Sequence, residues 1–95
     1  MTAVKAVLVD DIDDNPTPGA FEYFRDNERD VAGLFFNCPC GCGRQSALHF
    51  RPHPSPSWEW DGNSEAPTLR PSVHSMPDGK SHWHGWLTAG EWRKC

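Results

Sequence analysis

Apolar and polar residues alternate in short runs along this chain, and glycine and proline interrupt the runs repeatedly. A β-branched and aliphatic run at residues 3–9 predicts a first strand. Residues 31–38 and 46–52 predict the two strands of a hairpin, with the sequence CPCGCGR at its tip. Residues 81–92 predict a closing hairpin that turns at the sequence TAG. The runs are too short for long helices, so the pattern predicts a mostly β protein.

Three further segments carry a weaker form of the same pattern. Residues 20–30 predict a strand that enters a polar turn, although one helical turn also fits. Residues 58–62, with the sequence WEWDG, alternate between tryptophan and polar residues and end in an Asp-Gly turn signal. Residues 68–75 contain a proline in mid-run, which predicts an edge strand or a bulged strand. We therefore expect five or six short strands in a small antiparallel sheet or barrel.

The composition limits the size and the stability of this fold. A chain of 95 residues forms one domain at most, with a core that we expect at 18–95 and a peripheral strand and acidic loop at 1–17. The hydrophobic fraction is 37%, although five tryptophans and five phenylalanines add large buried side chains. Such a small core is marginal, so we expect a cross-link to stabilise it.

The charge pattern excludes two classes of partner. A net charge of −4 argues against nucleic acid, because phosphate binding needs clustered Lys and Arg. Acidic residues follow the short apolar run at the start, so we expect neither a signal peptide nor a membrane span. The acidic run at 10–19 lacks the ligand spacing of a calcium loop and is predicted to be a solvated loop. These features predict a cytoplasmic protein with reduced thiols.

Three of the four cysteines, Cys38, Cys40 and Cys42, lie within the predicted hairpin tip. They are too close for ordinary disulfides with one another, and at most one could pair with Cys95. A glycine follows Cys40 and another follows Cys42, which suits a tight turn with positive φ angles and backbone amides that point at sulfur. The tip is therefore predicted to be one half of a metal site.

The closing hairpin supplies the other half of the predicted site, in the sequence HWHGW. Alternation along a strand sends His82, His84 and Trp86 to one face, and Trp83 and Leu87 to the other. Two imidazoles on one strand face can reach the same ion. Thiolates and imidazoles from two separate elements are typical of a structural zinc site, so the predicted cofactor is Zn²⁺.

Five residues compete for the four positions of a tetrahedral zinc site: Cys38, Cys40, Cys42, His82 and His84. Cys38 and Cys42 span the turn, but pairs that include Cys40 fit as well, and the choice among the cysteines stays open. Cys95, at the end of the last strand, could replace a histidine.

The other histidines and two tryptophans receive structural interpretations. His49 is predicted to be a packed or surface residue, and His53 and His74 are predicted to be exposed. Trp58 and Trp60 share one face of their strand and are predicted to be core residues, with a ligand groove as the alternative.

The segment GNSEAPTLRPS is predicted to be a rigid loop. Pro67 and Pro71 stiffen it, and the hydroxyl groups of Thr68 and Ser72 can bond backbone groups that the prolines leave unpaired. We interpret it as a structural loop folded over the metal, with a binding loop as the alternative.

Three motifs in order, CPCGCG, WEWDGNSEAPTLRPSV and HWHGWLTAGEW, resemble a family of small, mostly uncharacterised proteins of phages and bacteria. Some members are labelled ammonia monooxygenases, although nothing in this sequence suits a membrane copper enzyme. The resemblance covers about residues 18–92. The matching residues are Cys38, Cys40, Cys42, Trp58, Trp60, Asp61, Gly62, Pro67, Thr68, Pro71, Ser72 and His84.

The resemblance implies a compact β domain built around one metal. His82 stands where relatives often carry cysteine, which supports His82 as a ligand. Some relatives lie beside genes of ubiquitin-like conjugation in bacteria, which implies a protein partner. The resemblance also implies a location in the cytosol of a bacterium or of a phage-infected host.

These features favour a small zinc-stabilised, non-enzymatic protein-binding module of phage or bacterial origin that modulates a host protein. The alternative is a zinc-dependent hydrolase with an open coordination position and a carboxylate as general base. A cysteine nucleophile, Cys40 with His84, is a variant of the enzymatic reading. A thiol redox protein would need a Cys-x-x-Cys spacing, which this chain lacks.

Overall fold

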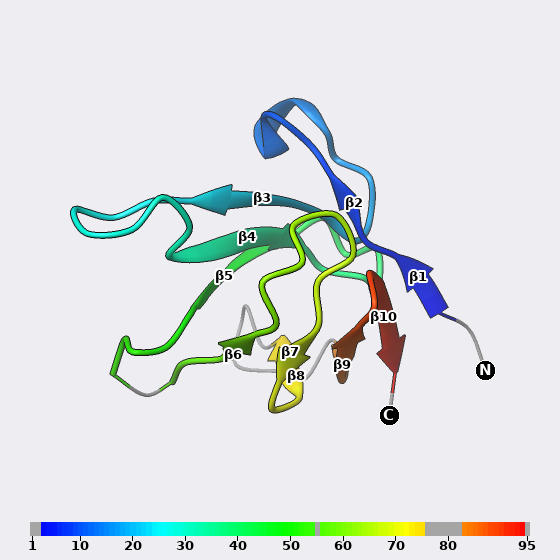
Figure 1. Ribbon diagram of the computed structural model, residues 1–95. Helices are drawn as coiled ribbons and strands as arrows, with labels where there is room; N and C mark the ends of the chain where they lie inside the picture. The colour runs from blue at the N-terminus through cyan, green and yellow to red at the C-terminus, as the bar shows by residue number, and fades with distance from the viewer. Residues whose placement is uncertain (1–2, 55, 76–82, 95) are drawn as a thin grey trace.

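The computed structural model describes residues 3–54, 56–75 and 83–94, and within them it contains short strands and a single turn of 3-10 helix. Figure 1 shows these elements along the chain. They are β1 (Ala3–Lys5), β2 (Val7–Leu8), η1 (Ile12–Asp14), β3 (Ala20–Phe24), β4 (Gly33–Asn37), β5 (Gln45–His49), β6 (Glu59–Trp60), β7 (Leu69–Arg70), β8 (Val73–Ser75), β9 (Trp83–Thr88) and β10 (Glu91–Lys94).

The strands form two four-stranded sheets and one small pair. Sheet A has the order β1-β10-β9-β8, sheet B has the order β2-β3-β4-β5, and β6 pairs with β7. All neighbours are antiparallel except β2 and β3, which run parallel. The prediction of a mostly β fold is confirmed, whereas an entirely antiparallel arrangement is wrong at β2. Among the described residues no helix is long and apolar enough to cross a membrane.

The first predicted strand is divided between the two sheets. β1 pairs with β10 in sheet A, and β2 pairs with β3 in sheet B. Ala6, between them, is buried and its N–H donates to Gly90 O at 2.9 Å. The chain therefore crosses from one sheet to the other at Ala6 (Figure 1).

The core lies between sheets A and B. One cluster of buried residues draws side chains from β3, β4 and β5 on one side and from β8, β9 and β10 on the other. Trp92 is fully buried and stacks on Phe36 with ring centroids 4.7 Å apart. Its indole N–H donates to Gly19 O at 2.9 Å. Trp92 thus joins the last strand of sheet A to sheet B by packing and by a buried hydrogen bond.

The hairpins that the sequence predicts are present. β4 and β5 pair on either side of the cysteine turn, and β9 and β10 pair around Ala89 and Gly90. Residues 20–24 form a strand rather than a helical turn. Residues 68–75 divide into β7 and β8 on either side of Pro71 and Ser72. Because predicted strands are divided in this way, the described residues contain ten strands instead of the five or six predicted.

The acidic segment at 10–19 is more than a solvated loop. It contains η1, whose Ile12 is buried with 4% of its surface exposed. The Ile12 N–H donates to a carboxylate oxygen of Glu22 at 3.0 Å, and the Asp13 carboxylate accepts from the Gln45 side chain at 3.1 Å. Packing and hydrogen bonds therefore attach this segment to sheet B.

Candidate functional site

The cysteine turn follows β4 and gathers three sulfur atoms. The Sγ atoms of Cys38, Cys40 and Cys42 all lie within 4.8 Å of one another, and all three are free thiols. Gly41 and Gly43 have φ angles of 85° and 83°, in the left-handed region that the sequence predicted for this turn. Backbone bonds from Cys38 N to Arg44 O and from Gly41 N to Cys38 O close the turn. This cluster could hold a metal ion.

The environments of the three thiols differ. Cys38 is buried in the core, whereas Cys40 and Cys42 are exposed. Partial desolvation and then hydrogen bonds with the thiols of Cys38 and Cys42 raise the pKa of Cys40 to about 11. Desolvation opposes any fall in the pKa of Cys42, but the backbone N–H of Arg44 and the neighbouring sulfurs lower it. Cys42 is therefore the exposed thiol more readily ionised.

The predicted histidine ligands are not brought to this cluster among the described residues. His84 lies on β9, where Trp83 and Leu87 are buried and His84 and Trp86 are exposed, as strand alternation predicted. Cys38 packs in the same core cluster as Trp83 and Leu87, so His84 points to the opposite side of sheet A. His82 and Cys95, the other predicted candidates, lie outside the described residues.

His84 instead meets a serine. Ser72 Oγ lies 3.0 Å from His84 Nε2. Ser72 is half-buried at the break between β7 and β8, and His84 is exposed on the neighbouring strand β9. With the imidazole protonated on Nδ1, Ser72 Oγ–H donates to Nε2. This is the contact between a nucleophile and its general base in serine hydrolases.

Two aromatic residues adjoin the Ser72–His84 pair. His74 lies directly opposite His84 in the β8–β9 ladder, and the two rings stack with centroids 4.7 Å apart and planes 29° apart. The indole N–H of Trp58 donates to Ser72 O at 3.2 Å. The first contact limits the rotation of the imidazole, and the second fixes the backbone of the serine.

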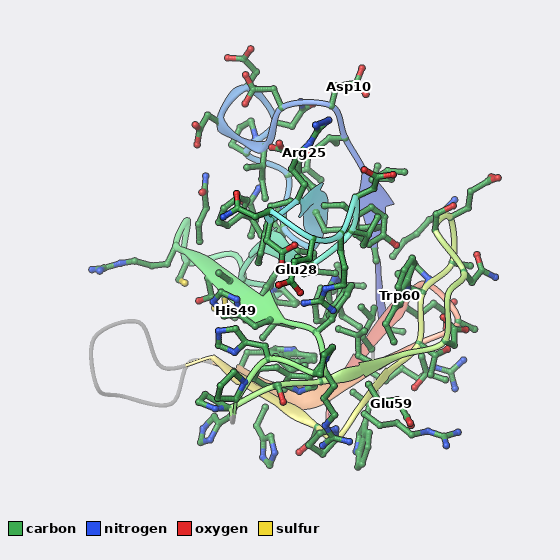
Figure 2. The ribbon with its side chains drawn as sticks, turned by 60° about the vertical axis from the view of Figure 1, so that its left-hand side comes forward. Asp10, Arg25, Glu28, His49, Glu59 and Trp60 are labelled. Atoms are coloured by element: carbon green, nitrogen blue, oxygen red, sulfur yellow. The ribbon has the colours of Figure 1, made fainter. Side chains whose placement is uncertain are left out.

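Trp60 lies in a different position from Trp58. Trp60 stacks on Phe50 with ring centroids 5.4 Å apart and is partly buried against the core. Figure 2 shows Trp60 directed toward the interior and Glu59 directed away from it. A pocket of about 320 Å³ lies here, and its lining residues are Glu59, Trp60, Asp61, Thr68 and Arg70. Trp60 alone of the two tryptophans lines this pocket, and both pack against the core cluster.

Hydrogen bonds from Tyr23 and Trp60 hold the loop beside this pocket. The Tyr23 hydroxyl donates to Ser64 O at 2.9 Å, and the Trp60 indole N–H donates to Asn63 O at 3.2 Å. Burial, and then the negative charge of Asp61, raise the pKa of Tyr23 to about 12. The hydroxyl group of Tyr23 is therefore protonated, and able to donate to Ser64 O, when the loop is folded.

The remaining histidines fit their structural interpretations. His49 is half-buried on β5, and His53 is exposed. Their rings stack with centroids 4.1 Å apart, and the ring of Phe24 meets His49 edge-on at 5.3 Å. His49 lies on sheet B and His53 on the segment after it.

Sequence reasoning missed the role of Ser72 as a partner of His84. Ser72 was assigned to backbone bonds within a rigid loop, and His84 to a metal. The two residues are twelve positions apart and belong to no short catalytic motif. Two sequence features could have pointed to this pair: Pro71-Ser72 in the middle motif and the outward-facing His84 in the last motif. Only the fold brings these two features together.

Residues 8–95 match the model of a family described as bacterial ubiquitination-like system serine protease (BubE). No curated protein and no solved structure matches the chain. The family description overturns the prediction of a non-enzymatic protein-binding module. It also departs from the zinc-hydrolase alternative, because a serine protease attacks with a hydroxyl group rather than a metal-bound water. Because the match extends over residues 8–95, the chain belongs to this bacterial ubiquitination-like system serine protease family.

Proposed function

We propose that the protein is a serine protease in which Ser72 is the nucleophile and His84 is the general base. The observation that carries this proposal is the 3.0 Å distance between Ser72 Oγ and His84 Nε2. The family description supports it, because it names a serine protease. The exposed position of His84 also supports it, since a peptide can approach the pair from solvent.

The chemistry follows that of other serine hydrolases. Ser72 Oγ attacks the carbonyl carbon of a peptide bond while His84 Nε2 accepts the Oγ proton. His84 then donates this proton to the leaving amine, and an ester between Ser72 and the substrate acyl group remains. Water attacks the ester, again with His84 as the base, and releases the carboxylic acid and the free serine. The stacked ring of His74 keeps the imidazole in place during both proton transfers.

We propose that the substrate is a protein of a bacterial ubiquitination-like system and that cleavage takes place in the cytoplasm. The family description names such a system, and this supports a protein partner. A cytoplasmic location suits the free thiols of the cysteine turn, because thiols stay reduced there.

A fluorophosphonate probe tests the nucleophile without knowledge of the natural substrate. We expect the wild-type protein to gain the mass of one probe on Ser72 and Ser72→Ala to gain none. We expect His84→Ala to react more slowly by about 10²–10⁴-fold, the usual contribution of a general base. Ser46→Ala, which removes another half-buried serine on β5, is the matched control and should react like the wild type.

Two further results complete the test. The double variant Ser72→Ala, His84→Ala should cleave peptide bonds no more slowly than Ser72→Ala alone, because the two groups act as a unit. The unfolding free energies of the single variants should stay within about 1 kcal/mol of the wild type, since neither side chain lies in the core. Labelling of Ser72→Ala at the wild-type rate would refute the assignment.

We also propose that the three-cysteine turn binds zinc as a structural ion. Three thiolates within 4.8 Å suit a tetrahedral, sulfur-rich site. Because the buried Cys38 belongs to the core cluster, the ion would fasten the β4–β5 hairpin to the core. Mass spectrometry of the intact protein should find about one zinc per chain, and a folded, metal-free preparation would contradict the proposal.

A further inference from the structure

Trp86 is a large apolar side chain that faces solvent beside the proposed active site. Its exposed fraction is 43%, although a tryptophan usually lies mostly buried. It follows His84 by two positions on β9, so the two side chains lie on the same face of sheet A. The other large exposed apolar residues of the described chain, Val7, Leu8 and Phe35, belong to sheet B.

The strand register brings Trp86 to Ser72 as well. Val73 pairs with Gly85 and His74 pairs with His84 in the β8–β9 ladder, which lies along one side of sheet A in Figure 1. Extending this register by one residue places Ser72 opposite Trp86. The chain before Ser72 reaches the turn that follows β9, because Ala89 N donates to Thr68 Oγ1 at 2.8 Å. Ser72 itself lies just outside the ladder, and the extended register puts Trp86 across from it.

On its other side, Trp86 faces an arginine that is paired with a carboxylate. Arg93 is its partner on β10, and the Arg93 guanidinium is 2.9 Å from a carboxylate oxygen of Glu91. An acidic substrate side chain would have to compete with Glu91 for this cation. An apolar side chain, in contrast, gains contact with the indole and removes apolar surface of both groups from water.

The acidic pocket of the molecule is too remote to contribute. It is lined by Asp10, Asp11 and Asp13 together with Glu22 and Phe35. Figure 2 shows Asp10 at the opposite end of the molecule from Glu59, which lies beside β7 and so near the break that carries Ser72. This acidic pocket therefore does not select the residue at the scissile bond.

We propose that Trp86 determines substrate specificity by receiving a large apolar side chain on the residue that supplies the scissile carbonyl. This inference rests on the proposed serine protease function and adds the class of peptide that it cleaves. The indole provides a flat apolar wall on the same face as Ser72, and a small side chain at that position buries little surface against it.

Peptidyl diphenyl phosphonates test this proposal directly. Ser72 Oγ attacks phosphorus while His84 accepts its proton, and His84 then passes this proton to the departing phenolate, so that phenol is released. The rate therefore reports the side-chain group next to the reacting phosphorus. Two probes differ only in that group, one carrying the side chain of phenylalanine and the other that of alanine. We expect the wild type to react about tenfold faster with the phenylalanine probe, and Trp86→Ala to react with both at similar rates. Leu8→Ala, which removes an exposed apolar side chain of sheet B, should keep the wild-type preference.

The outcomes separate the two proposals. Labelling of the wild type but not of Ser72→Ala supports the nucleophile. If Trp86→Ala then shows the same preference between the probes as the wild type, the nucleophile stands and the role of Trp86 is overturned. A wild type that is labelled without preference would overturn it as well. Labelling of Ser72→Ala would remove the proposed function itself.

Discussion

Replacing Trp92 by phenylalanine should weaken the whole domain, because this residue joins the two sheets in two ways. Phenylalanine keeps an aromatic ring against Phe36 but loses the indole N–H that donates to Gly19 O at 2.9 Å. Val7 N also donates to this carbonyl, but at the longer distance of 3.4 Å. The variant therefore leaves Gly19 O with one weak donor in a buried position.

The expected loss can be worked out in two parts. Phenylalanine is smaller than tryptophan by about 40 Å³, and a cavity of that size costs about 1 kcal/mol. A poorly satisfied buried carbonyl costs about 1–3 kcal/mol, and we take the lower half of that range because Val7 remains. The sum is about 2–3 kcal/mol, from a total of about 5–14 kcal/mol for a domain of this length. The melting temperature should fall by about 10–20 °C.

Urea unfolding followed by circular dichroism measures this difference, and Trp86→Phe is the matched control. It makes the same chemical change at a side chain that is 43% exposed, so its unfolding free energy should stay within about 0.5 kcal/mol of the wild type. Our reasoning fails if Trp92→Phe is as stable as Trp86→Phe.

Three other measurements test separate parts of the structure. Tyr23 is the single tyrosine of the chain, so alkaline absorbance titration of the folded protein should give its pKa alone, at about 12. Because folding raises that pKa above the ordinary value of 10.0, Tyr23 stabilises the fold fully below pH 10 and loses this effect as pH rises through 12; a folded-state midpoint at 10 would contradict the burial argument. Cys38→Ser should lower both the bound metal and the melting temperature, and a chelator should reproduce the temperature change in the wild type alone; full metal retention would count against the site. His74→Ala should slow probe labelling of Ser72 by about tenfold while His74→Phe preserves it, because a stacked ring orients His84; equal rates in both variants would remove this role.

The elements that the sequence predicted are those whose pattern is local. The hairpin of β4 and β5 follows from two apolar runs around a turn rich in glycine and cysteine, and its two glycines have the positive φ angles expected. The division of residues 3–9 between two sheets has no local signal, because Ala6 continues the apolar run. Its position depends on a contact with Gly90, near the other end of the chain.

The site shows the same distinction. Alternation along β9 correctly separated His84 and Trp86 from the core face, and this fact already turns His84 away from the buried Cys38. The sequence analysis nevertheless combined cysteine and histidine by residue type, since both are common zinc ligands. The contact between Ser72 and His84 depends on the β8–β9 register and on the interruption between strands β7 and β8 at Pro71 and Ser72. Both are tertiary features.

The crossing of the chain at Ala6 has a consequence for synthesis on the ribosome. Of the strands that the structure describes, β1 is made before all others, yet its partner in sheet A is β10, which is made after all others. β2 can pair with β3 soon after both emerge, whereas β1 must remain unpaired until Glu91–Lys94 has left the exit tunnel. Closure of sheet A, with His84 on its third strand, is therefore expected to be a late event, which delays the assembly of the proposed Ser72–His84 site until this segment has been translated.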